Sequence, residues 1–340
     1  MAIVTFCSNE IKETGQTLSL SAVATYMAIE HNYKILVIST DFNDLSLENC
    51  FWEYDKIRTN GAIRKDQNIG IESGIEGLIK ALKSNRTSNE IIKNYSRIVL
   101  KDRLDILLSP ATKSYQEYTE IVENYVDILQ VAKRYYDLIF IDLSKKMPRK
   151  DAAAILKLSD IVVINMTQRL KTINDFATLR QENDFYQRRN VMLLVGRYDR
   201  NSKYNTKNIT RYLKEKKLVS AVPYNTLFLE ACSEGKIIEF MLRAKNVTDE
   251  SDTNNIFIKE LREKREAKGV WLVDAVSKLS KHPQKETAAM ASILTAAISY
   301  LSLLEENCPV FNGINIQTED GWKELEEGIN ILIDIWLEKR

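Results

Sequence analysis

Histidine and cysteine are scarce in this sequence. Only two histidines occur among its 340 residues, His31 and His282, which nearly excludes a histidine-based catalytic triad or a histidine-rich metal site. The four cysteines lie far apart, in or beside apolar runs, and this spacing indicates free buried thiols rather than a disulfide framework or a zinc site. They are Cys7, Cys50, Cys232 and Cys308.

A large net charge and a long hydrophobic run are also missing. The formal net charge of +1 argues against tight nucleic-acid binding through overall electrostatics, although a local basic patch can still form. No basic segment or cleavage site follows Met1, so we expect a cytoplasmic protein without a signal peptide. The longest apolar run, residues 288–304, is short for a membrane span and contains Ser and Thr. It predicts a buried helix and no stable membrane insertion.

The beginning of the chain has the pattern of a strand, a turn, a helix and a second strand. Residues 1–8 are apolar and rich in β-formers, residues 17–31 carry apolar side chains at helical spacing, and residues 34–40 form another apolar run. The turn between the first strand and the helix contains a glycine. This order is typical of the opening βαβ unit of an α/β nucleotide-binding fold.

The turn matches only part of a phosphate-binding loop. Such loops follow the pattern G-x-x-x-x-G-K-[ST], and residues 10–17 read EIKETGQT. Gly15 supplies a permissive backbone and Thr17 a hydroxyl for Mg²⁺, whereas Gln16 stands at the lysine position and brings no charge. An ordinary strand-to-helix turn is the alternative. The candidate phosphate-binding residues are Lys12, Thr14, Gly15, Gln16, Thr17 and Leu18.

Two acidic residues follow apolar strands. Asp142 ends the strand in residues 136–143, and Asp41 comes directly after residues 34–40. Because parallel strands end at the same edge of a sheet, we expect Thr17, Asp41 and Asp142 to hold Mg²⁺ together. At each position an acid that merely ends a strand is the alternative, and the order of the three elements favours the metal site.

Apolar strands alternate with helices up to about residue 240. The predicted strands are residues 105–109, 136–143, 160–165, 191–195 and 219–223, and the predicted helices are residues 74–82, 115–135, 151–158, 176–187 and 206–216. This alternation predicts an α/β fold with a mostly parallel sheet and helices on both faces, as in P-loop NTPases, in residues 1–240. No strand alternates in residues 241–340, which we expect to form an all-helical C-terminal region.

The order and spacing of these motifs resemble the deviant-Walker P-loop ATPases of the ParA/MinD type. Residues 159–164 resemble the strand after the Walker B aspartate, residues 195–199 the segment that contacts adenine, and residues 221–236 the loop beside the base. The resemblance covers roughly residues 1–240 and is nearest to the TadZ/CpaE-like pilus-assembly branch. By this resemblance the base-side residues are Arg197, Pro223, Tyr224 and Asn225.

The departures from the family pattern concern charged groups. Gln16 replaces the loop lysine, and Ile11 stands where the family's signature lysine reaches across a dimer. Ser39 replaces the first aspartate of the D-x-D pair, and Gly196 replaces the adenine-reading asparagine. Phosphoryl transfer depends on positioning and charge neutralisation, so we expect slow or absent hydrolysis while nucleotide binding is retained.

The resemblance implies ATP or ADP with Mg²⁺, a homodimer, and a protein partner in a pilus, secretion or partitioning machine. One alternative is a scaffold that binds no nucleotide. Another is an active DNA-partitioning ATPase that uses the basic residues 145–150 and 211–217, although residues 145–150 can equally meet phosphates, an acidic partner or solvent. The amphipathic residues 322–338 have a net acidic polar face, which favours docking on protein over docking on anionic lipid.

Overall fold

The computed structural model describes most of the chain up to residue 245 and a few positions beyond. Described are residues 1–10, 14–53, 74–84, 90–110, 112, 114–215, 219–245, 257–258, 310–311, 314–315, 318, 320, 323–325 and 327. The chain divides into two compact units, Met1–Ser280 and Lys281–Arg340. The domain boundary that the sequence predicts after residue 240 stays a prediction.

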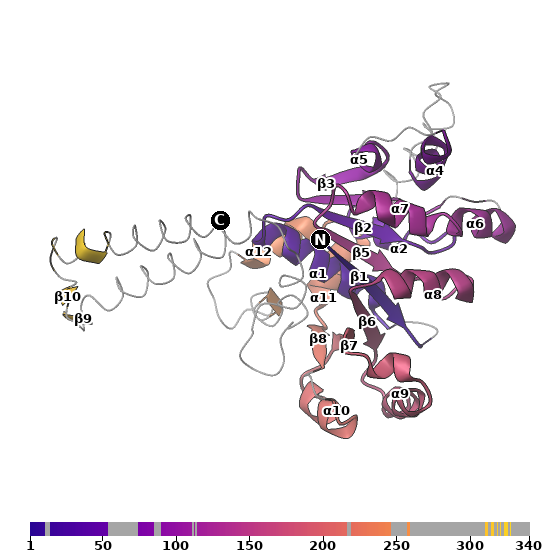
Figure 1. The fold of residues 1–340 in the computed structure, drawn as a ribbon. Coiled ribbons are helices and arrows are strands. Elements are labelled where there is room, and N and C mark those ends of the chain that lie inside the picture. Colours follow the sequence, from indigo (N-terminus) through magenta and orange to yellow (C-terminus); the bar gives the residue numbers. More distant parts are fainter. Residues whose placement is uncertain are drawn as a thin grey trace. The chain divides into compact units, whose positions relative to one another are not determined.

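An eight-stranded sheet lies at the centre of the first unit (Figure 1). The strand order is β3-β4-β2-β5-β1-β6-β7-β8, and neighbouring strands run parallel except β3, which is antiparallel to β4. The strands are β1 (Ala2–Ser8), β2 (Ile35–Ser39), β3 (Arg97–Leu100), β4 (Leu104–Leu107), β5 (Leu138–Asp142), β6 (Ile161–Met166), β7 (Val191–Tyr198) and β8 (Ser220–Pro223). The predicted α/β fold with a mostly parallel sheet is therefore confirmed.

Helices cover both faces of this sheet. They are α1 (Gln16–Glu30), α2 (Ser46–Asn49), α4 (Ile75–Lys83), α5 (Ile91–Tyr95), α6 (Tyr115–Val122), α7 (Tyr125–Ala132), α8 (Arg149–Leu158), α9 (Leu170–Glu182), the 3₁₀ helix η1 (Asp184–Gln187), α10 (Thr206–Tyr212), α11 (Thr226–Ser233) and α12 (Ile237–Lys245). Alternate residues of β1 face opposite cores: Val4 and Phe6 pack with α1, and Ile3 packs with the α7 side. Because both faces are covered, β2, β5 and β6 are buried at every residue, and their apolar runs made them predictable.

Polar side chains end two helices earlier than their apolar patterns predict. The helix expected over residues 115–135 is two helices, because Asn124 donates its amide to the carbonyl of Glu120 (2.7 Å) and so competes with the backbone ladder. The helix expected over residues 176–187 begins earlier, as α9, and ends at Glu182. There Asn183 accepts the N–H of Phe185 (2.9 Å) and starts the separate η1 turn.

Several smaller features complete the comparison with the sequence. Cys7, Cys50 and Cys232 are free thiols, as predicted, whereas Cys308 lies outside the described residues. The described residues of the second unit include a short antiparallel hairpin, β9 (Val310–Phe311) with β10 (Ile314–Asn315), which the sequence analysis does not predict. The helices expected in that region lie largely outside the described residues. In the part of the chain that is described, no helix combines the length and apolarity needed to cross a membrane.

Two buried tyrosines fix the end of β2, where the sequence places Asp41. Tyr118 of α6 donates its hydroxyl to the carbonyl of Thr40 (2.6 Å), and Tyr125 of α7 donates to the carbonyl of Ser39 (3.1 Å). Thr40 in turn donates its hydroxyl (3.0 Å) and its backbone N–H (3.1 Å) to the carbonyl of Asp142. These bonds tie the ends of β2 and β5 together and so position both acidic residues.

Removing one of these hydroxyls is expected to destabilise the protein. Tyr118→Phe leaves a buried carbonyl without its side-chain donor, and we expect the free energy of unfolding to fall by about 1 kcal/mol. Tyr212→Phe, at a side chain that is 57% exposed, is the matched control. Urea denaturation of both variants measures the difference, and equal stability of the two would show that the bond to Thr40 contributes nothing.

Candidate functional site

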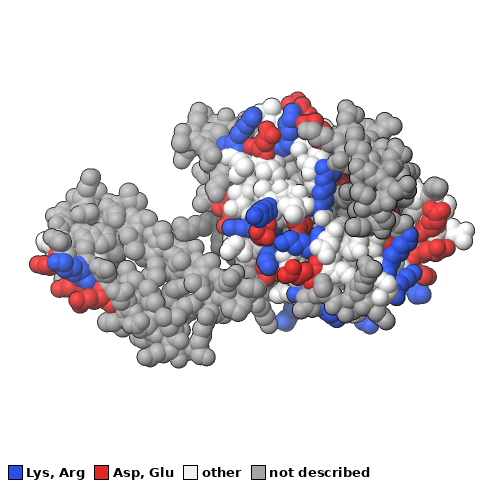
Figure 2. All heavy atoms as spheres, turned by 90° about the horizontal axis from the view of Figure 1, so that it is seen from above, with Lys and Arg blue, Asp and Glu red and all other residues white. Residues whose placement is uncertain are grey.

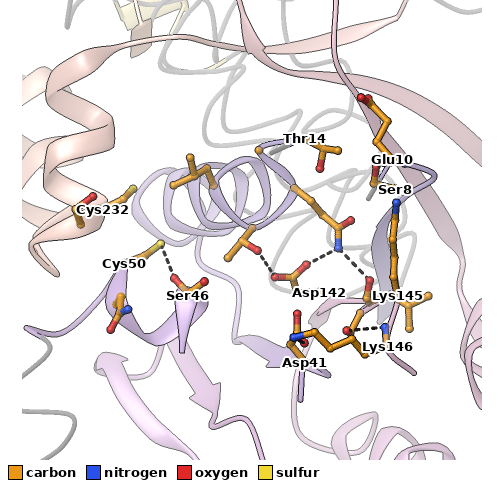
Figure 3. A pocket seen from close by; sticks show the side chains of 18 residues that line it. Ser8, Glu10, Thr14, Asp41, Ser46, Cys50, Asp142, Lys145, Lys146 and Cys232 are labelled. Atoms are coloured by element: carbon orange, nitrogen blue, oxygen red, sulfur yellow. Dashed lines mark hydrogen bonds and ion pairs between the residues drawn. The ribbon is translucent and has the colours of Figure 1, made fainter. Parts of the chain in front are cut away.

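A cavity of about 790 Å³ lies where the ends of β1, β2 and β5 meet the start of α1 (Figure 3). It brings together seven of the residues predicted to bind phosphate or metal and joins them to the turn that follows β5. The lining residues are Ser8, Glu10, Thr14, Gly15, Gln16, Thr17, Leu18, Asp41, Ser46, Asn49, Cys50, Asp142, Leu143, Ser144, Lys145, Lys146, Cys232 and Ser233. The metal and phosphate candidates of the described chain therefore meet at one place. Lys12 and Ile11 lie outside the described residues.

Gly15 ends the loop in a conformation that favours glycine. Its φ of +70° and ψ of 22° are left-handed, and α1 begins at the next residue. The positive φ favours glycine, and a Cβ atom added to Gly15 would also stand only 3.1 Å from Cγ of Arg197. Gly15 therefore supplies, immediately before α1, the permissive backbone that the sequence predicts there.

The side chain of Gln16 points toward the carboxyl ends of β1 and β5. Its amide nitrogen lies 2.5 Å from Oδ1 of Asp142, 3.1 Å from the carbonyl of Leu143 and 3.2 Å from the carbonyl of Phe6. Three acceptors share its two N–H groups, so Gln16 is held in place by β1 and by the end of β5. In this arrangement the residue at the lysine position contributes hydrogen bonds and no positive charge.

Asp142 is a buried carboxylate that forms no ion pair with the described residues. It is 8% exposed, and Thr17 donates its hydroxyl to Oδ2 (2.7 Å) while Gln16 occupies Oδ1. Burial raises the pKa of Asp142 to about 6, the two hydrogen bonds act in the opposite direction, and Asp41 and Asp44 add to the increase. The carboxylate that the sequence places at the Walker B position therefore keeps its proton to a higher pH than an exposed aspartate does.

Asp41 is paired with a lysine. Its Oδ1 lies 2.9 Å from the ammonium of Lys146 and accepts the N–H of Phe42 (2.7 Å). The oxygens of Thr17, Asp41 and Asp142 are the donors that Mg²⁺ prefers, and two carboxylates with a hydroxyl fit an ion whose other ligands are water and phosphate. Both carboxylate oxygens of Asp142 and Oδ1 of Asp41 already have protein partners, so a metal at these atoms would have to replace Gln16, Thr17 or Lys146. In the described ranges no group of three or more His, Cys, Asp and Glu side chains is arranged to hold a metal.

The predicted base-side residues lie apart from this cavity. Arg197, Pro223, Tyr224 and Asn225 surround a void of about 10 Å³, and only Leu18 lines both places. The guanidinium of Arg197 lies over the ring of Tyr224, 5.7 Å from its centre. A void of this size is at the limit for a single water, so a purine requires Arg197 or Tyr224 to move.

Asn225 caps a helix, and together with Pro223 and Tyr224 it lines a second pocket. Its side chain accepts the N–H of Phe228 (2.8 Å) and so caps α11. With Pro223 and Tyr224 it also lines a separate pocket of about 310 Å³ beside Tyr198 and Phe257.

Glu10 and Thr14, the described residues on either side of the loop, are held by contacts that the sequence analysis does not predict. Asn165, at the end of β6, donates its amide to the carbonyl of Thr14. A Cβ atom on Gly196 would stand 2.3 Å from the same carbonyl, so β7 needs glycine there. Both oxygens of Glu10 are bonded to Thr167, one to its N–H (2.7 Å) and one to its hydroxyl (2.9 Å). A polar residue ending the strand in residues 160–165 was the available signal for Asn165.

The raised pKa of Asp142 predicts how stability depends on pH. Between about pH 4 and pH 6 the folded state keeps a proton that the unfolded state releases, so this carboxylate lowers stability as the pH rises through that window. Asp142→Asn removes the free-energy cost of burying the ionised carboxylate. We therefore expect the change in the free energy of unfolding on substitution to be about 2 kcal/mol more favourable to the variant at pH 8 than at pH 4. Denaturant unfolding at both pH values, with exposed Asp175→Asn as the control for one lost charge, measures this difference. The same change at both pH values would contradict a raised pKa.

Comparison with known proteins gives a fold likeness and no sequence match. No protein-family model matches the sequence, and no curated protein matches it. Among solved structures, a ParA family ATPase from Chlorobium tepidum TLS is similar with a TM-score of 0.54 and 16% identity, over 72% of this chain and 93% of that chain. The cell division ATPase MinD of Pyrococcus furiosus is similar with a TM-score of 0.52 and 12% identity, over 76% and 96%. At these identities the likeness establishes the fold, and the sheet with its helices has the fold of ParA and MinD ATPases.

Proposed function

We propose that this protein binds ATP or ADP with Mg²⁺ at the cavity between β1, β5 and α1, hydrolyses it slowly or not at all, and acts as a homodimer that localises a partner. The observation that supports this best is the contact of Gln16 and Thr17 with Asp142. The turn, the helix start and the strand end of a phosphate site meet there, with an amide at the lysine position. The two structural relatives are named as ATPases.

Slow hydrolysis follows from the charges that the site lacks. Gln16 cannot neutralise the developing charge on the transferred phosphoryl group, which in P-loop enzymes is a main task of the lysine. Ser39 stands at the first position of the D-x-D pair, and its hydroxyl accepts the N–H of Asp41 (3.3 Å). A serine hydroxyl is a much weaker base than a carboxylate, so Ser39 does not activate water.

The role in localisation rests on the resemblance to the TadZ/CpaE-like branch, in which loops without the lysine are familiar. A dimer around nucleotide and a partner in a pilus, secretion or partitioning machine are part of the same proposal. The surface charges support DNA less well as a partner of this chain. Figure 2 shows Lys and Arg intermingled with Asp and Glu on the described part of one face, which differs from the basic stripe of DNA-binding surfaces.

Loss of the loop hydroxyl tests nucleotide binding. Titration of the full chain with a fluorescent ATP analogue, with and without Mg²⁺, is expected to show Mg²⁺-dependent binding and a shift from monomer to dimer. Thr17→Ala should weaken binding about tenfold, because it removes a candidate Mg²⁺ ligand. Thr178→Ala, on α9 outside the cavity, is the matched control. No binding by the unmodified protein at millimolar nucleotide would replace this proposal with the scaffold that binds none.

Restoring the loop lysine separates binding from hydrolysis. Gln16→Lys puts an ammonium beside the phosphates, and we expect affinity for the ATP analogue to rise about tenfold. Phosphate release should remain slow, because Ser39 still lacks the carboxylate. Gln116→Lys adds a lysine on the exposed surface of α6 and serves as the control. Rapid hydrolysis by Gln16→Lys would show that the lysine alone was missing.

A further inference from the structure

Two lysines bring positive charge to the cavity from an unexpected element. Among the described lining residues, Lys145 and Lys146 are the basic ones, against the acidic Glu10, Asp41 and Asp142. Both lysines lie in the turn between β5 and α8. The cations of the described site therefore come from the turn after Asp142.

This turn is held in a defined position by hydrogen bonds. Ser144 donates its N–H to the hydroxyl of Thr40 (2.8 Å), and its own hydroxyl accepts the N–H of Lys146 (3.1 Å). Tyr115 of α6 donates its hydroxyl to the carbonyl of Lys146 (2.8 Å). The carbonyl of Leu143 accepts the amide of Gln16, which joins the turn directly to the phosphate loop. The backbone that carries the two lysines is thus fixed against both β2 and α1.

The two lysines differ in what they contact. Lys146 pairs with Asp41 and donates to the carbonyl of Phe42 (3.4 Å). Lys145 extends along the cavity wall with its ammonium group beside Ser8 (Figure 3). Among the described residues, Glu10 and the thiol of Cys7 act electrostatically on Lys145, and both oxygens of Glu10 are already bonded to Thr167. Burial lowers the pKa of Lys145, so its ammonium is partly removed from water beside the loop.

We propose that Lys145 supplies the cation that binds the phosphate chain of the nucleotide, in the role that the residue at position 16 has in loops with a lysine. This inference rests on the proposed function and assigns a binding residue within it. A lysine ammonium is a compact charge on a flexible stem, so it can follow a phosphate group without movement of the fixed turn. An ammonium partly removed from water gains more from a phosphate than one that is fully hydrated. The phosphates would then lie between Lys145 and Thr17, with Gln16 beneath them.

The direct test compares Lys145 in the turn with Lys150 in the helix that follows it. Lys145→Gln should weaken binding of the fluorescent ATP analogue about tenfold or more, because it removes a charge-assisted contact. Lys145→Arg keeps the charge and should stay within a few-fold of the unmodified protein. Lys150→Gln removes one charge from the exposed start of α8 and is the matched control. Thermal unfolding of all variants confirms that the fold is retained.

Competition with inorganic pyrophosphate shows whether the contact is made to the phosphate chain. Pyrophosphate should compete with the analogue on the unmodified protein and lose affinity in Lys145→Gln by a similar factor. Unchanged pyrophosphate competition in that variant would overturn the assignment.

A double variant provides an independent check. If Lys145 replaces the missing loop cation, then Gln16→Lys should restore most of the affinity lost in Lys145→Gln. This inference would be overturned if the unmodified protein binds the analogue and Lys145→Gln binds it as tightly as Lys150→Gln does. The proposed function would then remain. Failure of the unmodified protein to bind analogue or pyrophosphate would overturn both.

Discussion

The buried carboxylate of Asp142 is the interaction on which the rest of the site depends. Its two oxygens are held by the first two residues of α1, and its backbone carbonyl is held by Thr40 at the end of β2. One residue thereby joins β5, β2 and α1 at the edge of the sheet. Because its partners are an amide and a hydroxyl, the cost of removing the charge from water is not offset by a cation, and the pKa rises to about 6. The site lacks positive charge at the place where a phosphate loop normally has it.

One departure from the family pattern, Gly196, is explained by the packing on the base side of the loop. The carbonyl of Thr14 is held by Asn165 and approaches β7 so closely that a side chain on Gly196 would collide with it. Arg197 then passes beside Gly15 and lies over Tyr224, where it fills the space between Leu18 and the end of β8. An asparagine at position 196 would collide with the carbonyl of Thr14 where that residue now lies. The glycine at 196 is therefore needed for Thr14 to approach β7 so closely.

The fold was largely predictable because its signals are local, whereas much of the site was not. Continuous apolar runs identify β2, β5 and β6, and the shared edge of parallel strands brings Thr17 and Asp142 together as expected. The half-exposed antiparallel β3 and the helix break at Asn124 give no such pattern, since each depends on its neighbours. The contact of Gly196 with Thr14 joins segments far apart in the sequence, which no spacing rule reveals.

Asp41, unlike Asp142, has a cation partner, and that cation comes from the turn after β5. Its carboxylate is paired with Lys146, so an ammonium occupies the position where oxygen ligands would meet Mg²⁺. A divalent ion bound through the same oxygen would have to displace Lys146. Since Ser144 and Tyr115 fix the turn that carries Lys145 and Lys146, the loss of the loop lysine need not leave the cavity without a cation.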